Sequence, residues 1–331
     1  YRNTAVGTDA MHSNTGGIEN TNVGYFSGYG STTGSYNSMV GAFTGYLMTT
    51  GTQNAALGYQ ALRGTAAGSS SASFNVAMGY NALTLVTTAS QNVGIGHYAL
   101  YQTTTGIRNI AIGAGTMDQL TTGERNIGIG AYANRWLVDG DNNTAIGHQA
   151  LYLNANAKQN LAIGDSALYS FNPGSNTEYW NVAVGPWSQS GSTAGYGNTS
   201  LGALSMVPIG IGSYNTSTGY LSMRNSAGAY YNTANGYTAL YNLTNGTGNT
   251  AVGMYAGYNV TTENYNAALG YSAGDNYGIT QGTFVGAFAY PNAAGYTNIG
   301  GFGYNARPTA SNMIRVGNTT VTSINGAVAF T

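Results

Sequence analysis

Four aromatic side chains are the residues best suited to ligand binding in this sequence of 331 residues. Tyr179, Trp180 and Trp187 lie close together in the chain, and Trp136 is the only other tryptophan. An aromatic ring offers a flat apolar face on which a sugar ring stacks, while nearby amides and hydroxyls bond the sugar hydroxyls. We therefore expect a glycan-binding patch formed by Trp136, Tyr179, Trp180 and Trp187. Packing of these tryptophans between protomers, or over an exposed edge, is an alternative of equal weight.

Metal chemistry has weaker support in the sequence. His97 and His148 share one position of an internal repeat but stand three repeats apart, so they cannot chelate one metal within a chain. The segment from Asp139 to Asp141 contains two carboxylates, yet it lacks the spacing and the bidentate glutamate of an EF-hand loop. The chain also has no cysteine. We expect neither a metal site nor a cofactor.

Catalytic motifs are not found in the sequence. Apart from Asp139 and Asp141, the ten Asp and Glu residues are scattered singly, and no acid pair typical of glycoside hydrolysis stands out. Neither a nucleophile elbow nor a Walker lysine occurs. We predict that the chain is not an enzyme. A carboxylate pair assembled from different protomers is the one alternative, and no motif predicts it.

Charge is scarce throughout the chain. Lys and Arg number 9, Asp and Glu number 10, and the net charge is -1. Such a chain has no basic field to neutralise phosphates, so we expect no nucleic-acid partner and no docking to anionic membranes. No apolar run reaches the roughly 18 residues needed to span a bilayer, so we expect no membrane insertion. Without a start Met or a basic leader, the chain is expected to be a processed product or an excised fragment.

An internal repeat positions all of these residues. The motif Asn3-Thr-Ala-Val-Gly7 recurs, and 13 of the 16 intervals between its glycines are 17 residues. We call these residues anchor glycines, and we call a column the residues that share one position relative to them. Asn stands four before the anchor in 16 of 17 repeats. The anchor glycines are Gly7, Gly24, Gly41, Gly58, Gly79, Gly96, Gly113, Gly130, Gly147, Gly164, Gly185, Gly202, Gly219, Gly236, Gly253, Gly270 and Gly286.

This period predicts an all-β parallel β-solenoid (β-roll) of about 17 coils. Two glycine-marked turns and short runs of Val, Ile and Thr fit one coil with two strands of about five residues. The asparagines then stack as a structural ladder of side-chain amides. A tyrosine column five after the anchor is expected to stack in the same way. Two repeats are four residues longer, at 64–74 and 171–180, and such insertions often lie on a binding face.

The strand motif predicts a partner for one sheet face. The residue two before the anchor is mostly small, as in Ala56 and Ala145, while the residue one before it is Val, Ile or Leu on the opposite face. A strand that is apolar on both faces is buried on both. Because a narrow coil has only one interior, we expect identical chains to cover the second face as a homo-oligomer.

The repeat resembles the β-roll heads of trimeric bacterial adhesins and, more closely, the repeats of trimeric phage tail fibres. The shared features are the asparagine motif and the following Tyr-x-Ala-Leu, found at 58–62, 79–83 and 236–240. Residues 1–303 carry the resemblance. Residues 304–331 resemble the neck before an endosialidase-type intramolecular chaperone, which is cleaved off or absent here. The resemblance implies a homotrimeric fibre outside the cell, on a cell surface or a virion.

The sequence therefore favours a non-enzymatic trimeric fibre or adhesin that presents a receptor-binding surface for cell attachment, with surface glycan as the expected ligand. A structural spacer rod with its binding tip elsewhere is the first alternative. An ice-binding solenoid ranks third, because the best threonine column, three before the anchor, is interrupted by Val, Ile or Leu in six repeats.

Overall fold

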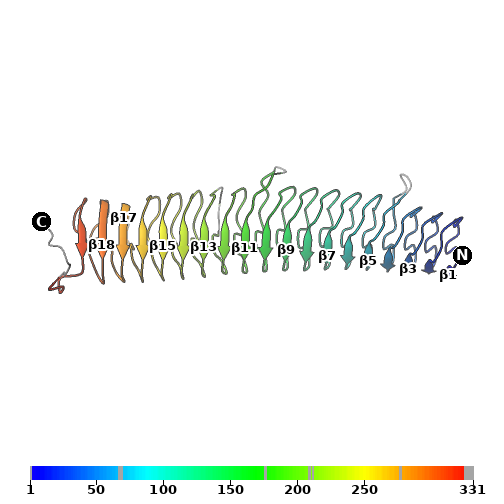
Figure 1. Cartoon of the computed structure of the whole chain (residues 1–331), viewed down its shortest axis with the longest axis horizontal. Coiled ribbons are helices and arrows are strands. Elements are labelled where there is room, and N and C mark those ends of the chain that lie inside the picture. The colour runs from blue at the N-terminus through cyan, green and yellow to red at the C-terminus, as the bar shows by residue number, and fades with distance from the viewer. Residues whose placement is uncertain are drawn as a thin grey trace. The chain divides into compact units, whose positions relative to one another are not determined.

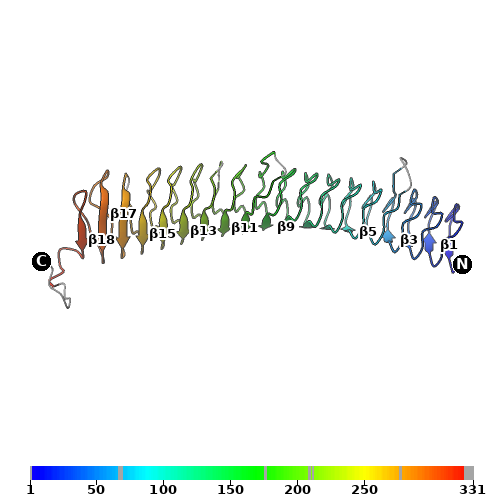
Figure 2. The ribbon, with the colours of Figure 1, turned by 45° about the horizontal axis from the view of Figure 1, so that its top comes forward.

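In the residues that the structure describes, the regular elements are short parallel strands, one to a coil (Figures 1 and 2). The computed structural model describes residues 2–65, 70–174, 177–207, 210, 212–275 and 278–323. The chain divides into unit 1, Tyr1–Ala194, and unit 2, Gly195–Thr331. Each unit is a parallel β-solenoid, which confirms the all-β fold and its 17-residue spacing. Within the described residues, no helix has the length and apolar character to cross a membrane.

Among the described residues, unit 1 contains eleven strands and unit 2 contains eight. The strands of unit 1 are β1 (Thr4–Val6), β2 (Thr21–Val23), β3 (Ser38–Val40), β4 (Ala55–Leu57), β5 (Val76–Met78), β6 (Val93–Ile95), β7 (Ile110–Ile112), β8 (Ile127–Ile129), β9 (Thr144–Ile146), β10 (Leu161–Ile163) and β11 (Val182–Val184). Those of unit 2 are β12 (Thr199–Leu201), β13 (Thr216–Thr218), β14 (Thr233–Asn235), β15 (Thr250–Val252), β16 (Ala267–Leu269), β17 (Thr280–Val285), β18 (Thr297–Phe302) and β19 (Ile314–Val316).

The central residue of a typical strand points into the coil. In β7, Ala111 is fully buried, whereas Ile110 and Ile112 on either side are 36% and 39% exposed. Neighbouring strands pair in parallel without slippage, so that Ala111 lies opposite Gly128 of β8. Because successive strand residues face opposite sides, the small central residue fills the narrow interior and the larger neighbours form an outer face.

The prediction of two five-residue strands per coil is wrong. In most coils the structure has one strand of three residues, and only isolated bridges such as Ser73 to Ser90 form elsewhere in the coil. The reason lies in the backbone after the anchor glycine, where left-handed residues alternate with right-handed ones. Tyr98 has a φ of 58° and Leu100 a φ of 53°. Such a segment is a run of turns, because a strand requires extended residues throughout.

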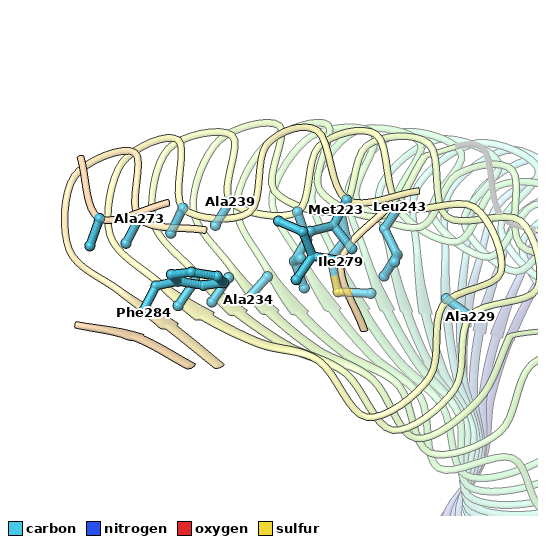
Figure 3. Close-up of a cluster of buried hydrophobic side chains, with 14 of the residues drawn as sticks. Met223, Ala229, Ala234, Ala239, Leu243, Ala273, Ile279 and Phe284 are labelled. Carbon is cyan, nitrogen blue, oxygen red and sulfur yellow. The ribbon is translucent and has the colours of Figure 1, made fainter. Parts of the chain in front are cut away.

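The interior is filled by small and medium-sized apolar side chains. In unit 2, Ala234 and Ala239 come from the strand and the turn segment of one coil, and Phe284 fills a larger space beside Ala273 (Figure 3). All four are buried. In the described residues, the core is therefore a narrow column of buried side chains in each unit.

The asparagine column forms the predicted ladder. Asn109 is fully buried. Its Nδ2 donates to Asn92 Oδ1 at 3.1 Å and to the carbonyl oxygen of Gly123 at 2.8 Å. Its own Oδ1 accepts hydrogen bonds from the backbone N and the Nδ2 of Asn126. Each amide therefore satisfies buried backbone groups as well as its neighbour in the next coil. The structural role predicted for this column is confirmed.

The tyrosine column five after the anchor also stacks between coils. Tyr152 and Tyr169 lie with ring centroids 5.1 Å apart and an interplanar angle of 3°. Tyr241 and Tyr258 repeat this arrangement in unit 2, again at 5.1 Å. The packing role expected for these rings is confirmed for the pairs that the structure describes.

Parallel pairing continues beyond the last predicted repeat. Strand β18 lies at the C-terminal end of the predicted solenoid, and β19 pairs with it after residue 303. Ile299 stands where the asparagine of the motif would be, which explains why the sequence motif fades there. The neck predicted for 304–331 stays a prediction, since residues 324–331 lie outside the described part of the chain.

Candidate functional site

A groove beside Trp180 is the candidate site. Its volume is about 370 Å³, and it lies over the outer face of β9, β10 and β11. The indole of Trp180 is an exposed wall, since this residue is 56% accessible to solvent. Leu161 and Val182 supply an apolar floor, and Asn142, Thr144 and Gln159 supply polar groups. The combination of an aromatic wall, an apolar floor and a few polar groups is typical of sites that bind small molecules.

The repeat explains why these side chains converge. Thr144, Leu161 and Val182 occupy one column and pair in register between neighbouring strands. Asn142, Gln159 and Trp180 occupy the column five before the anchor. The backbone of all three is left-handed, with φ values of 57°, 60° and 50°. This conformation recurs along the column, so it is a property of the coil and no sign of strain specific to this groove.

The two amides of the groove keep one donor and one acceptor for a ligand. Asn142 Oδ1 accepts a hydrogen bond from Arg125 Nε at 3.1 Å, and Gln159 Nε2 donates to Glu178 Oε1 at 3.1 Å. Within the described residues, Asn142 Nδ2 and Gln159 Oε1 have no hydrogen-bond partner. These existing bonds fix the orientation of both amides, and the remaining atoms match the donor and acceptor character of a sugar hydroxyl.

One charge pair lies next to the groove residue Gln159 in the chain. Lys158 Nζ lies 2.7 Å from Asp141 Oδ2, and this hydrogen bond raises the pKa of the lysine. The other oxygen of Asp141 accepts a bond from the backbone N of Glu124 at 2.8 Å. The pair Asp139 and Asp141, which superficially resembles a calcium loop, therefore has one carboxylate already occupied. In the described parts of the chain, no cluster of three His, Asp or Glu side chains could hold a metal.

Tyr179 does not belong to the predicted glycan patch. It is only 2% exposed, and its ring packs edge-on against Phe171 at 5.2 Å. Although the two residues are neighbours in the chain, Trp180 faces outward and Tyr179 faces the core. The sequence prediction treated the two neighbours as one aromatic surface, and the structure corrects this.

Trp136 and Trp187 are exposed but belong to other columns. Trp136 is 43% exposed and stands six after its anchor, while Trp187 is 49% exposed and stands two after its anchor. The guanidinium of Arg135 lies 5.5 Å from the centre of the Trp136 ring. None of the ring contacts in the described chain joins two tryptophans. The expected single patch is therefore reduced to one groove at Trp180, with two separate exposed tryptophans.

The two histidines of the anchor column are separate, as expected. His97 stacks on Tyr80 with ring centroids 5.4 Å apart. His148 Nδ1 lies 3.8 Å from Asp165 Oδ2, and both side chains are about half exposed. Each histidine therefore has its own local contact, and the two do not form a site.

The polar half of the groove was missed at the sequence level. Asn142 and Thr144 belong to one repeat and Gln159 to the next, but a motif search emphasises columns that repeat, and these positions differ from coil to coil. A search of the column five before the anchor for departures from its polar character would have found Trp180 beside two amides.

Comparisons with protein-family models, with curated proteins and with solved structures found no match for this chain.

Proposed function

We propose that this chain is a non-enzymatic fibre or adhesin that attaches to cells by binding surface glycan in the groove at Trp180. The observation that carries the proposal is the exposed indole beside one free amide donor and one free amide acceptor. A sugar ring would stack on the indole while its hydroxyls bond Asn142 Nδ2 and Gln159 Oε1. A neutral sugar fits best, because the side chains that line the groove carry no charge.

The proposal includes a homotrimer. Support comes from the outer face of β5 to β8, where Met78, Ile110, Ile112 and Ile129 are between 36% and 40% exposed. A continuous apolar sheet face of this kind is typical of an interface. Three copies would also present three grooves, so that a weak individual site gives firm attachment through avidity.

The remaining parts of the proposal follow from the resemblance of the repeats to trimeric phage tail fibres and bacterial adhesins. The chain would work outside the cell, on a cell surface or a virion, and an intramolecular chaperone would assist its assembly. It would use no cofactor, bind no nucleic acid and insert into no membrane. The low charge of the chain supports the absence of a nucleic-acid partner.

Substitution of the groove tests the proposal. Trp180→Ala should weaken binding to host cells or to a glycan array by at least about tenfold, the equivalent of a lost ring-stacking contact. Gln159→Ala should also weaken binding, by a smaller factor. Trp136→Ala is the matched control, because it removes an exposed indole outside the groove and should leave binding unchanged. Full binding by the Trp180 variant would overturn the glycan site.

Two other functions would remain if no glycan binds. A spacer rod is supported by the regular ladder in both units, and it predicts no binding by any surface of the chain. Ice binding is supported by Thr199, Thr216, Thr233 and Thr250, which pair in register on β12 to β15 without interruption. Thermal hysteresis of a concentrated solution separates these two, since only an ice-binding face produces it.

A further inference from the structure

Pairs of tyrosines in neighbouring coils lie face to face at the surface. The clearest pair is Tyr214 and Tyr231, whose ring centroids are 5.3 Å apart with an interplanar angle of 5°. Both rings are more than half exposed, at 53% and 62%. Two parallel phenols held at this separation, and open to solvent, are placed for reaction with each other.

The solenoid itself holds this pair together. Both tyrosines stand five before an anchor glycine, and each precedes the strand of its coil by two residues. The strands β13 and β14 pair in register, with Thr216 opposite Thr233. The backbone N of Tyr231 also donates to the carbonyl oxygen of Ser213 at 3.2 Å. The spacing of the rings is therefore set by the spacing of the coils, and it persists while the side chains move.

We propose that Tyr214 and Tyr231 are a site of oxidative cross-linking, at which a peroxide-driven oxidant joins the two rings as dityrosine. Each phenol loses one electron and one proton to give a phenoxyl radical. The radicals couple through the ring carbons next to the hydroxyl-bearing carbon, and loss of the ring hydrogens to the hydroxyl oxygens restores both phenols. One hydrogen peroxide accepts the two electrons and the two protons and leaves as two waters. Exposed side chains reorient in picoseconds to nanoseconds, so the reacting carbons can meet within a stacked pair.

Such a bond would act as a staple between coils. The chain has no cysteine and cannot form disulfides. A covalent link between residues 17 positions apart would restrict the unfolded chain in the same sense as a disulfide that closes a short loop. It would also keep two successive coils in register, which would stabilise the protein at the extracellular location of the proposed function.

The same column contains two tyrosines that serve as internal controls. Tyr36 and Tyr265 are 52% and 63% exposed, so their access to an oxidant matches that of the reactive pair. The neighbouring coils place Glu19 and Gln53 beside Tyr36 at this position, and Gly248 and Gln281 beside Tyr265. Neither tyrosine has a column neighbour with which to couple, so exposure and pairing can be separated within one protein.

The test is treatment of dilute protein with a haem peroxidase and hydrogen peroxide, followed by peptide mass mapping and dityrosine fluorescence. We expect a peptide pair linked through Tyr214 and Tyr231, lighter by two hydrogens than the sum of its parts. Tyr231→Phe keeps the ring but removes the phenol, and should abolish that linked pair. Tyr265→Phe should leave its yield unchanged.

Two results would overturn the proposal. One is the absence of the linked pair under conditions in which free tyrosine dimerises. The other is a set of cross-links in which Tyr36 and Tyr265 react as often as Tyr214 and Tyr231, since exposure alone would then explain the chemistry. Glycan binding by the unoxidised protein is measured separately, so failure of the cross-link leaves the proposed attachment function untouched.

Discussion

The outer faces of β5 to β8 and of β12 to β15 differ, although the interiors of the two regions are built from the same kinds of residue. In the first region the outward residues are Val, Ile or Met, as in Ile110 and Ile112. In the second the first outward residue of every strand is threonine, as in Thr216 and Thr233. The buried central residue is Ala, Gly or Ser in both. The coil therefore constrains the inside and leaves the outside free to take on a separate role in each unit.

This difference assigns the self-association of the proposed fibre to unit 1. An apolar sheet face loses unfavourable contact with water when another chain covers it, at roughly 25 cal/mol per Å². A threonine face gains less, since its hydroxyls are already satisfied by water. If a charge on the apolar face and a charge on the threonine face have the same effect on assembly, the assignment of self-association to unit 1 is wrong.

The largest expected effect is on the solution mass. Ile127→Asp places a carboxylate in the middle of the apolar face, and burial of that charge in an interface would cost several kcal/mol. The purified chain should have three times its 34.1 kDa mass, about 102 kDa, and the variant should fall towards 34 kDa in light scattering coupled to size exclusion.

Thr233→Asp is the matched control for that experiment. It adds the same charge at the same position of a strand, but on the threonine face of unit 2. The mass should stay that of the unsubstituted chain. A mass near 34 kDa for the unsubstituted chain would contradict the assembly itself, and equal dissociation by both variants would contradict its assignment to unit 1.

The second prediction concerns the shared interior. Asn109→Ala and Asn232→Ala each remove a ladder amide. Each leaves three buried groups unpaired, namely a backbone carbonyl, and the backbone N–H and one Nδ2 N–H of the next asparagine. Each loss should cost about 3 kcal/mol of local stability, since an unsatisfied buried polar group costs about 1–3 kcal/mol. Hydrogen exchange at the amides of Asn126 and Asn249 measures this loss.

The losses of local stability in the two variants should agree closely, because the hydrogen-bond distances around Asn109 and Asn232 are nearly the same. A much larger loss in one unit would show that the outer face contributes to the stability of the ladder. Exchange at an amide several coils away serves as the control, since stability in repeat proteins is transmitted mainly between neighbouring coils.

What repeats was predictable from the sequence. The ladder of Asn109 and its equivalents, the buried Ala111 and the stacked Tyr152 and Tyr169 all follow from columns with constant chemistry. Such columns combine many observations of one environment, so a single sequence contains enough information to assign them. The coil spacing follows from the same columns.

What occurs once was not predictable in the same way. Tyr179 was placed in the ligand patch because a pattern of adjacent aromatics does not show which of them faces the core. Asn134 stands in a column of leucine and methionine, is fully buried, and has neither amide atom hydrogen-bonded in the described structure. The groove amides Asn142 and Gln159 became candidates only when the coil brought them beside Trp180.

The smallest expected effect lies in one turn of unit 2. Seven residues before the anchor, where most repeats have glycine or alanine, this turn has Glu263. Its carboxylate accepts hydrogen bonds from the backbone N of Thr262 at 2.9 Å and of Gly278 at 2.6 Å, and from that of Thr261. Burial alone would raise the pKa of Glu263, but these bonds outweigh it and lower the pKa.

A lowered pKa means that the ionised form stabilises the folded state. This contribution is fully present above the ordinary glutamate pKa and is lost as the pH falls through the lower folded-state value. Glu263→Gln should therefore cost about 1 kcal/mol at neutral pH, because a hydrogen bond to a charged acceptor is stronger than one to an amide. The difference should shrink in acid, where the glutamate of the unsubstituted chain is itself protonated. Denaturant unfolding followed in unit 2 at several pH values measures the difference in free energy of unfolding. Glu19→Gln is the control, because Glu19 is an exposed acid that forms a surface ion pair with Arg2. If the loss of stability caused by Glu263→Gln does not change with pH, the charge of Glu263 does not stabilise this turn, and the shape of its side chain alone does.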